Sequence, residues 1–157
     1  MKKGLYILLC ICLLAALATG CSEGYKANVN GIDVDISEMT NLLAYSQVVH
    51  ILDTPADYIG KTLKIRGQYF SSYFEQTGLY HHFVVVGDEE LCCQMGMEFV
   101  LKGKNSYPED YPVQDAEIEV VGIFESYDLS GSTLYRMAIN DIMVLETEGL
   151  EKAAIEG

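Results

Sequence analysis

The spacing of apolar residues changes along the chain, and each change predicts a different kind of element. An uninterrupted apolar run covers residues 5–18, directly after Lys2 and Lys3. Apolar residues then recur at helical spacing over about residues 37–53 and alternate with polar ones from residue 62 onward. The pattern therefore predicts a short apolar leader, one helix and a β domain, in that order.

The predicted helix has both a start and a stop signal. Asp35, with Glu38 three residues later, has the pattern of a capping box, and Pro55 ends the helical spacing. The apolar stripe between these signals is expected to pack on the domain rather than to stay available for a partner. Its members are Met39, Leu42, Leu43, Val49 and Leu52.

Five segments have the character of strands. In the first, Leu63, Ile65 and Tyr69 alternate with polar side chains, and Gly67 predicts a bend or bulge, as Gly122 does in the fourth. The predicted strands cover residues 62–70, 80–86, 91–101, 117–127 and 133–145, with a loop over residues 102–114. This all-β pattern after one N-terminal helix predicts a five-stranded OB-like barrel, with a small sandwich as the alternative.

The apolar leader is shorter than the roughly 20 residues that a membrane-spanning helix needs. It ends in Leu17-Ala18-Thr19-Gly20-Cys21, which resembles the lipobox of bacterial lipoproteins. This resemblance implies cleavage after Gly20 and attachment of diacylglycerol and fatty acyl chains such as palmitate to Cys21. Because each buried methylene contributes about 0.8 kcal/mol, these chains would anchor the protein to the membrane. An uncleaved anchor helix or an ordinary signal peptide is the alternative.

The resulting organisation has four parts. Residues 1–20 are a lipoprotein signal peptide, 21–34 the lipidated N-terminus and a tether, 35–146 the helix and the OB-like barrel, and 147–157 a C-terminal tail. The expected location is the extracytoplasmic side of a bacterial cell membrane, within the cell envelope.

The mature chain is strongly acidic, which limits its partners. Loss of Lys2 and Lys3, with no acidic residue, changes the formal net charge from −13 to −15. Nucleic acid is not expected as a partner because its affinity for proteins comes largely from Lys and Arg. The expected partners are the membrane, through the lipid anchor, and a carbohydrate, peptide or membrane protein.

The cysteines predict no ordinary disulfide framework. Cys10 and Cys12 leave with the signal peptide and Cys21 is lipidated, so only Cys92 and Cys93 remain in the domain. Neighbouring residues in a strand point to opposite faces, so these two thiols would not share one metal ion without distortion.

A candidate thiol or metal site combines these cysteines with a histidine. If residues 87–90 turn the chain so that Val84 faces Cys93, His82 lies diagonally beside Cys93. Two ligands are fewer than the four of a structural zinc site, and the metal is left unassigned. The alternatives are cysteines in the core and an intermolecular disulfide.

Tyrosines are numerous for a small domain, and OB barrels stack ligands on aromatic faces. The candidate binding face comprises Tyr69, Tyr73, Tyr80 and Tyr135. The alternative is that such rings cap the barrel and line its edges. Two acidic segments, residues 88–90 and 109–110, are either calcium ligands or solvated turns.

No catalytic motif occurs in the sequence, which predicts that the protein is not an enzyme. There is no phosphate-binding loop, no Gly-x-Ser-x-Gly and no His-Glu-x-x-His. His50, His81 and His82 lack a sequence motif that would place a nucleophile beside them.

Three segments carry a resemblance to a known group. They are Pro55-Ala56-Asp57-Tyr58-Ile59-Gly60-Lys61-Thr62, Cys92-Cys93-Gln94-Met95-Gly96-Met97-Glu98-Phe99-Val100 and Tyr107-Pro108-Glu109-Asp110-Tyr111-Pro112. Residues 40–145 resemble uncharacterised OB-like lipoproteins of Gram-positive bacteria, most specifically through Cys-Cys-x-x-Gly-x-Glu-Phe. Tyr-Ile-Gly-Lys and Cys-Cys are also similar to the soluble domain of a bacterial permease-associated family. The resemblance implies an OB-like fold and carries no activity.

The sequence therefore predicts a membrane-anchored, non-enzymatic binding or accessory module. The alternative function is a thiol-based metal-handling or redox protein that uses Cys92 or Cys93, as a partner of a membrane transporter. Apart from the covalent lipid on Cys21, no cofactor is expected.

Overall fold

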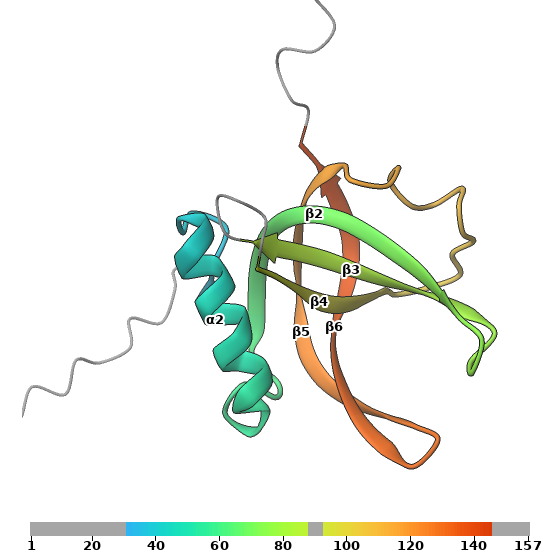
Figure 1. The fold of residues 1–157 in the computed structure, drawn as a ribbon, viewed down its shortest axis with the longest axis horizontal. Helices are drawn as coiled ribbons and strands as arrows, with labels where there is room; N and C mark the ends of the chain where they lie inside the picture. The colour runs from blue at the N-terminus through green and yellow to red at the C-terminus, as the bar shows by residue number, and fades with distance from the viewer. Residues whose placement is uncertain (1–30, 88–92, 146–157) are drawn as a thin grey trace, which may run out of the picture.

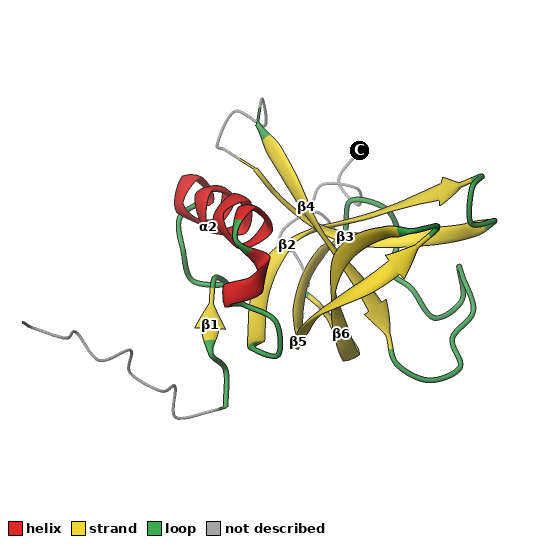
Figure 2. Ribbon diagram, turned by 90° about the horizontal axis from the view of Figure 1, so that it is seen from below, coloured by secondary structure: helices red, strands yellow, loops and turns green. Residues whose placement is uncertain are grey.

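The computed structural model describes residues 31–87 and 93–145, and these residues form a mostly β structure with one α-helix (Figures 1 and 2). The signal peptide, Cys21, Cys92, most of the tether and the C-terminal tail lie outside the described residues. The elements in chain order are β1 (Val34–Asp35), α2 (Asn41–Asp53), a 3₁₀ turn η1 (Pro55–Asp57), β2 (Thr62–Phe74), β3 (Leu79–Gly87), β4 (Gln94–Leu101), β5 (Glu117–Leu129) and β6 (Ser132–Val144).

Five of the six strands are joined in a ring of hydrogen bonds. β2 pairs with β3, β3 with β4, β4 with β6, β6 with β5, and β5 again with β2. The β4–β6 pairing is parallel, whereas the other four pairings of the ring are antiparallel. β1 adds a sixth, two-residue strand parallel to β2. Val34, expected in the tether, is therefore part of the sheet.

Glycines allow close approach of neighbouring strands in this ring. A Cβ atom at Gly67 would lie 2.3 Å from the carbonyl oxygen of Val85. A Cβ atom at Gly122 would lie 2.6 Å from the carbonyl oxygen of Ala138, and the β5–β6 register shifts beside this position. The sequence prediction that both strands bend at an internal glycine agrees with these contacts.

The helix begins later than the capping-box pattern predicts. Asp35 is in β1, where its Oδ1 atom accepts hydrogen bonds from the backbone N (3.0 Å) and the hydroxyl (2.6 Å) of Ser37. The carboxylate thus stabilises the link that leads to the helix, and Thr40 occupies the N-cap position. The predicted start at residue 37 and the assignment of Asp35 as N-cap are wrong.

The helix covers one side of the ring and contacts β3 and β4 (Figure 1). Its buried face comprises Ala44, Val48 and Ile51. The predicted stripe is wrong at its N-terminal end, because Met39, Leu42 and Leu43 are exposed. The core inside the ring also contains Leu63, Ile65, Tyr69, Val84, Met97, Phe99, Ile118, Val120, Phe124, Met137 and Ile139.

Candidate functional site

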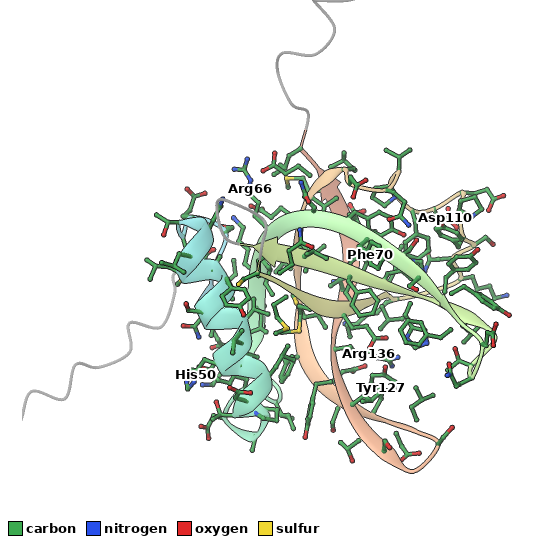
Figure 3. All side chains as sticks on the ribbon, viewed as in Figure 1. His50, Arg66, Phe70, Asp110, Tyr127 and Arg136 are labelled. Carbon is green, nitrogen blue, oxygen red and sulfur yellow. The ribbon has the colours of Figure 1, made fainter. Side chains whose placement is uncertain are left out.

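Three phenylalanines lie on the outer face of the sheet formed by β2, β3 and β4. Leu63, Ile65 and Tyr69 of β2 are buried, so the residues that alternate with them point outward. Phe70 and Phe74 therefore lie outside the ring, where they are 46% and 37% exposed. Phe83 of β3 lies between them, with ring centroids 6.4 Å from Phe70 and 6.5 Å from Phe74. Figure 3 labels Phe70 on β2.

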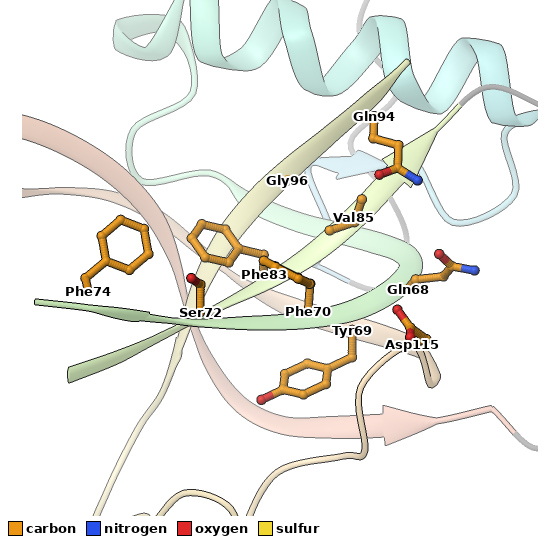
Figure 4. Close-up of a pocket in the computed structure, with 10 residues that line it drawn as sticks. All are labelled: Gln68, Tyr69, Phe70, Ser72, Phe74, Phe83, Val85, Gln94, Gly96 and Asp115. Carbon is orange, nitrogen blue, oxygen red and sulfur yellow. The ribbon is translucent and has the colours of Figure 1, made fainter. Parts of the chain in front are cut away.

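These rings border an open groove of about 540 Å³. The groove has an apolar part around Phe70, Phe74, Phe83 and Val85, and polar side chains from Gln68, Gln94, Ser72 and Asp115 (Figure 4). Tyr69 contributes its backbone, because its ring points to the opposite side of β2 (Figure 4). An apolar surface with a few polar groups at its rim is the usual composition of a small-ligand site.

Gly96 of β4 provides the space in which the Phe83 ring lies. A Cβ atom at Gly96 would be 3.3 Å from Cδ1 of Phe83. A larger residue would therefore push the ring outward into the groove.

Asp115 contributes a carboxylate at the polar end of the groove (Figure 4). Its φ of 65° is in the left-handed region, which Asp adopts more readily than most residues. The backbone N–H of Asp115 donates to the carbonyl oxygen of Tyr69 at 2.9 Å. This hydrogen bond ties the turn before β5 to the middle of β2 and so fixes the position of the carboxylate.

A polar network lies beside the phenylalanines. Glu98 of β4 accepts the hydroxyl of Tyr127 at 2.6 Å and contacts Nδ1 of His81 at 2.7 Å. The guanidinium of Arg136 lies 4.4 Å from the Tyr127 ring centroid, and its Nε donates to Glu125 at 2.9 Å. Burial, followed by the hydrogen bond to Glu98, raises the pKa of Tyr127 above its ordinary value. Tyr127 is therefore a neutral hydrogen-bond donor at physiological pH.

Thr77 places a hydroxyl beside His81, which the sequence motifs do not indicate. Its Oγ1 atom lies 3.1 Å from Nε2 of His81. The same oxygen donates to the carbonyl of Phe74 at 3.1 Å and accepts the N–H of Leu79 at 3.3 Å. Because these contacts close the turn between β2 and β3, we assign the Thr77 hydroxyl a role in the turn rather than in nucleophilic attack.

The four tyrosines of the predicted binding face are not on one surface. Tyr69 is fully buried, and its assignment to an exposed face is wrong. Tyr135 is partly buried and stacks on Phe124 with ring centroids 5.8 Å apart. Tyr73 and Tyr80 do lie together, 5.3 Å apart between ring centroids and 53% and 45% exposed.

The predicted pairing of His82 with Cys93 is also wrong. Gly87 pairs with Gln94, and His82 pairs with Phe99 rather than lying diagonally beside Cys93. His82 is buried, whereas Cys93 is exposed. Within residues 31–87 and 93–145, no group of three or more His, Cys, Asp or Glu side chains is arranged to hold a metal ion.

The sequence contains one signal for the phenylalanine groove, which the predicted tyrosine face does not include. The alternation that buries Leu63, Ile65 and Tyr69 also predicts that Phe70 and Phe74 point outward. Two aromatic residues on the polar face of one strand were thus detectable. Asp115 and the facing positions Gln94 and Gly96 depend on the β3–β4 register and on the turn before β5, which the pattern does not specify.

Comparison of the chain with models of protein families and with curated proteins finds no match. The class of the protein therefore follows from its own structure. Residues 31–87 and 93–145 form a mostly β structure with one α-helix, a ring of paired strands and an apolar groove with a polar rim on the outer face of the sheet.

Proposed function

We propose that this protein is a lipid-anchored, non-enzymatic binding module of the bacterial cell envelope, with an OB-like fold and a ligand site in the phenylalanine groove. The observation that carries the binding proposal is the exposure of Phe70 and Phe74 beside Phe83 on a sheet face. Exposed aromatic side chains clustered around a groove mark interaction sites more often than isolated apolar residues do.

The strand order supports the OB-like interpretation. An OB-fold is a five-stranded, partly open Greek-key barrel that binds its ligands on the face of its second and third strands. With β2 counted as the first strand of the ring, the strand order is 1-2-3-5-4. The fourth strand, β5, closes the ring by pairing with the first strand, β2. The second and third strands are then β3 and β4, which provide Phe83 and Gly96 to the groove.

The sequence supports the lipid anchor. The apolar leader ends in Leu17-Ala18-Thr19-Gly20-Cys21, and residues 22–30 separate Cys21 from Gly31, where the described domain begins. In the part of the chain that the structure describes, no helix is long and apolar enough to cross a membrane.

Mass spectrometry tests the anchor directly. The full chain is produced in a bacterium that processes lipoproteins, and the intact mass is measured in the membrane fraction. We expect a chain that starts at Cys21 and carries diacylglycerol, and we expect Cys21→Ser to lack the lipid and leave the membrane fraction. A wild-type chain without lipid contradicts the anchor and leaves the groove proposal intact.

The groove favours a neutral oligosaccharide as ligand. Sugars offer an apolar ring face to aromatic side chains and hydroxyl groups to amides and carboxylates, and the groove provides both kinds of group. The formal charge of −15 after signal cleavage disfavours polyanions, including nucleic acid.

Calorimetric titration with neutral oligosaccharides, such as chitotetraose and cellotetraose, tests this ligand class. Phe70→Ser removes a groove ring, and we expect it to weaken binding roughly tenfold. Tyr73→Ser is the matched control, because Tyr73 is similarly exposed on the same strand but faces the other side. Equal losses in both variants, or no binding by the wild type, contradict the proposal.

The thiol-based alternative has weaker support. Cys93 is exposed and could react with a metal or an oxidant, but it is apart from His82. Titration of thiols together with metal analysis of the purified protein tests it. About one zinc or copper ion per chain, lost in Cys93→Ser, would favour this function over sugar binding.

A further inference from the structure

The N-terminal end of α2 carries an exposed apolar patch, which we define as Met39, Leu42 and Leu43. Leu42 is 61% exposed, Leu43 58% and Met39 38%. The opposite face of the helix packs on the ring through Ala44, Val48 and Ile51, so the patch is not needed for the core.

The outward face of α2 is apolar only at this end. Further along the helix, Ser46, His50 and Asp53 are the exposed residues. Between residues 38 and 43, the single charged side chain is that of Glu38. Thr40 and Asn41 are also exposed in this segment, and no side chain caps the helix N-terminus, so only an insertion shallow enough to leave these polar groups in water is favourable.

The patch and the start of the described chain lie on the same side of the molecule, opposite the β2–β3 turn (Figures 1 and 2). The described chain begins at residue 31 and runs through β1 before it reaches α2, so β1 lies between this starting point and the helix (Figure 2). The link to the patch is fixed, because the N–H of Ile36 donates to the carbonyl of Lys64 at 2.8 Å and that of Met39 to the carbonyl of Ile36 at 3.1 Å. The ten residue steps from Cys21 to Gly31 span at most about 35 Å.

From this placement we infer that Met39, Leu42 and Leu43 dock on the surface of the lipid bilayer and orient the domain on the membrane. The inference rests on the proposed anchor at Cys21, which keeps the patch within reach of the lipid. Apolar side chains on one face of a helix can lie at the boundary between the lipid headgroups and the acyl chains.

The chain contains no tryptophan, so a single introduced tryptophan reports on this contact. Leu42→Trp places the probe in the patch. Leu79→Trp is the matched control, because Leu79 is 63% exposed and lies at the turn between β2 and β3, on the opposite side of the molecule from α2 (Figures 1 and 2). Both full-length, lipidated variants are reconstituted in vesicles of neutral phosphatidylcholine, with and without bromine on the acyl chains.

We expect brominated lipid to quench the fluorescence of the Leu42→Trp variant and to leave that of the Leu79→Trp variant unchanged. Quenching of neither variant, or equal quenching of both, overturns the inference. A blue shift of the Leu42→Trp emission without quenching by bromine also overturns it, because protein rather than lipid then covers the patch. Flotation of the vesicles reports on the anchor separately. Protein that floats with the vesicles but is not quenched contradicts the docking of the patch and leaves the anchor intact. Protein that does not float contradicts the anchor.

Discussion

At the scale of single residues, His82 is a titratable group that the fold buries. Its Nδ1 atom lies 2.7 Å from the Tyr69 hydroxyl, and its ring stacks on Tyr111 with centroids 3.8 Å apart. Burial raises the pKa of Tyr69 to about 12, so this hydroxyl keeps its proton, and the direction of its hydrogen bond with His82 follows the tautomer of the imidazole. Burial, followed by the charge of His81, lowers the pKa of His82 to about 4. His82 is therefore neutral in the folded protein at physiological pH.

This depressed pKa predicts a loss of stability in acid. Between pH 6.5 and about 4 the unfolded chain binds a proton at His82 and the folded chain does not, so the free energy of unfolding falls as the pH falls. The His82 contribution over that window is roughly 3 kcal/mol. Urea unfolding of the wild type and of His82→Phe at pH 7, 5.5 and 4 measures the contribution of His82 to the pH dependence of the free energy of unfolding. Parallel pH profiles for the two proteins contradict the assignment.

At the scale of elements, the segment between β4 and β5 is attached to β2 by a side chain that extends the sheet. Pairing of β2 with β5 ends at Gln68 and Glu117. Beyond that point, Oε1 of Gln114 accepts the N–H of Ser71 at 3.0 Å, and its Nε2 donates to the carbonyl of Ser71 at 2.9 Å. The amide of Gln114 thus replaces a partner strand.

Loss of this amide is expected to destabilise the domain. Gln114→Met keeps the length of the side chain but leaves the backbone of Ser71 without these hydrogen bonds, at a cost of about 2 kcal/mol. Gln94→Met, at an exposed amide on β4, is the control and is expected to change stability by less than about 0.5 kcal/mol. Thermal unfolding of both variants measures the difference. Equal melting temperatures would show that Gln114 does not have this role.

Two glycines of the sheet differ in what surrounds them. A Cβ atom at Gly67 would meet backbone atoms of Val85, whereas one at Gly96 would meet the movable side chain of Phe83. We expect Gly67→Ala to lower the free energy of unfolding by about 3 kcal/mol and Gly96→Ala by about 1 kcal/mol. Denaturant unfolding measures both values, and the reverse order contradicts the strand packing described above.

Alternation in residues 62–70 and the glycines at 67 and 122 predict the strands of the ring well, because both signals are local. The helix start is mispredicted because Asp35 stabilises the turn at Ser37 instead of capping the helix. His82 and Cys93 are mispaired because their relation depends on the β3–β4 register, which distant packing sets. The anchor at Cys21 stays a prediction.

At the scale of the whole molecule, the two proposed contacts occupy different parts of the surface. The patch of Met39, Leu42 and Leu43 is on α2, and the groove is on the outer face of β2, β3 and β4. The β2–β3 turn points away from α2 (Figure 2). A domain that docks through α2 would therefore direct this turn away from the membrane, with Phe74 next to it.

The most direct test of the binding proposal is the location of a bound sugar. Amide chemical shifts of the soluble chain from Ser22 onward are recorded while chitotetraose is added. A ligand in the groove shifts the amides of Phe70, Phe83 and Gly96 and leaves those of Tyr80 and Tyr135 largely unchanged. Shifts centred on Tyr80 and Tyr135, or no shifts at all, would contradict the assignment of the phenylalanine groove as the ligand site.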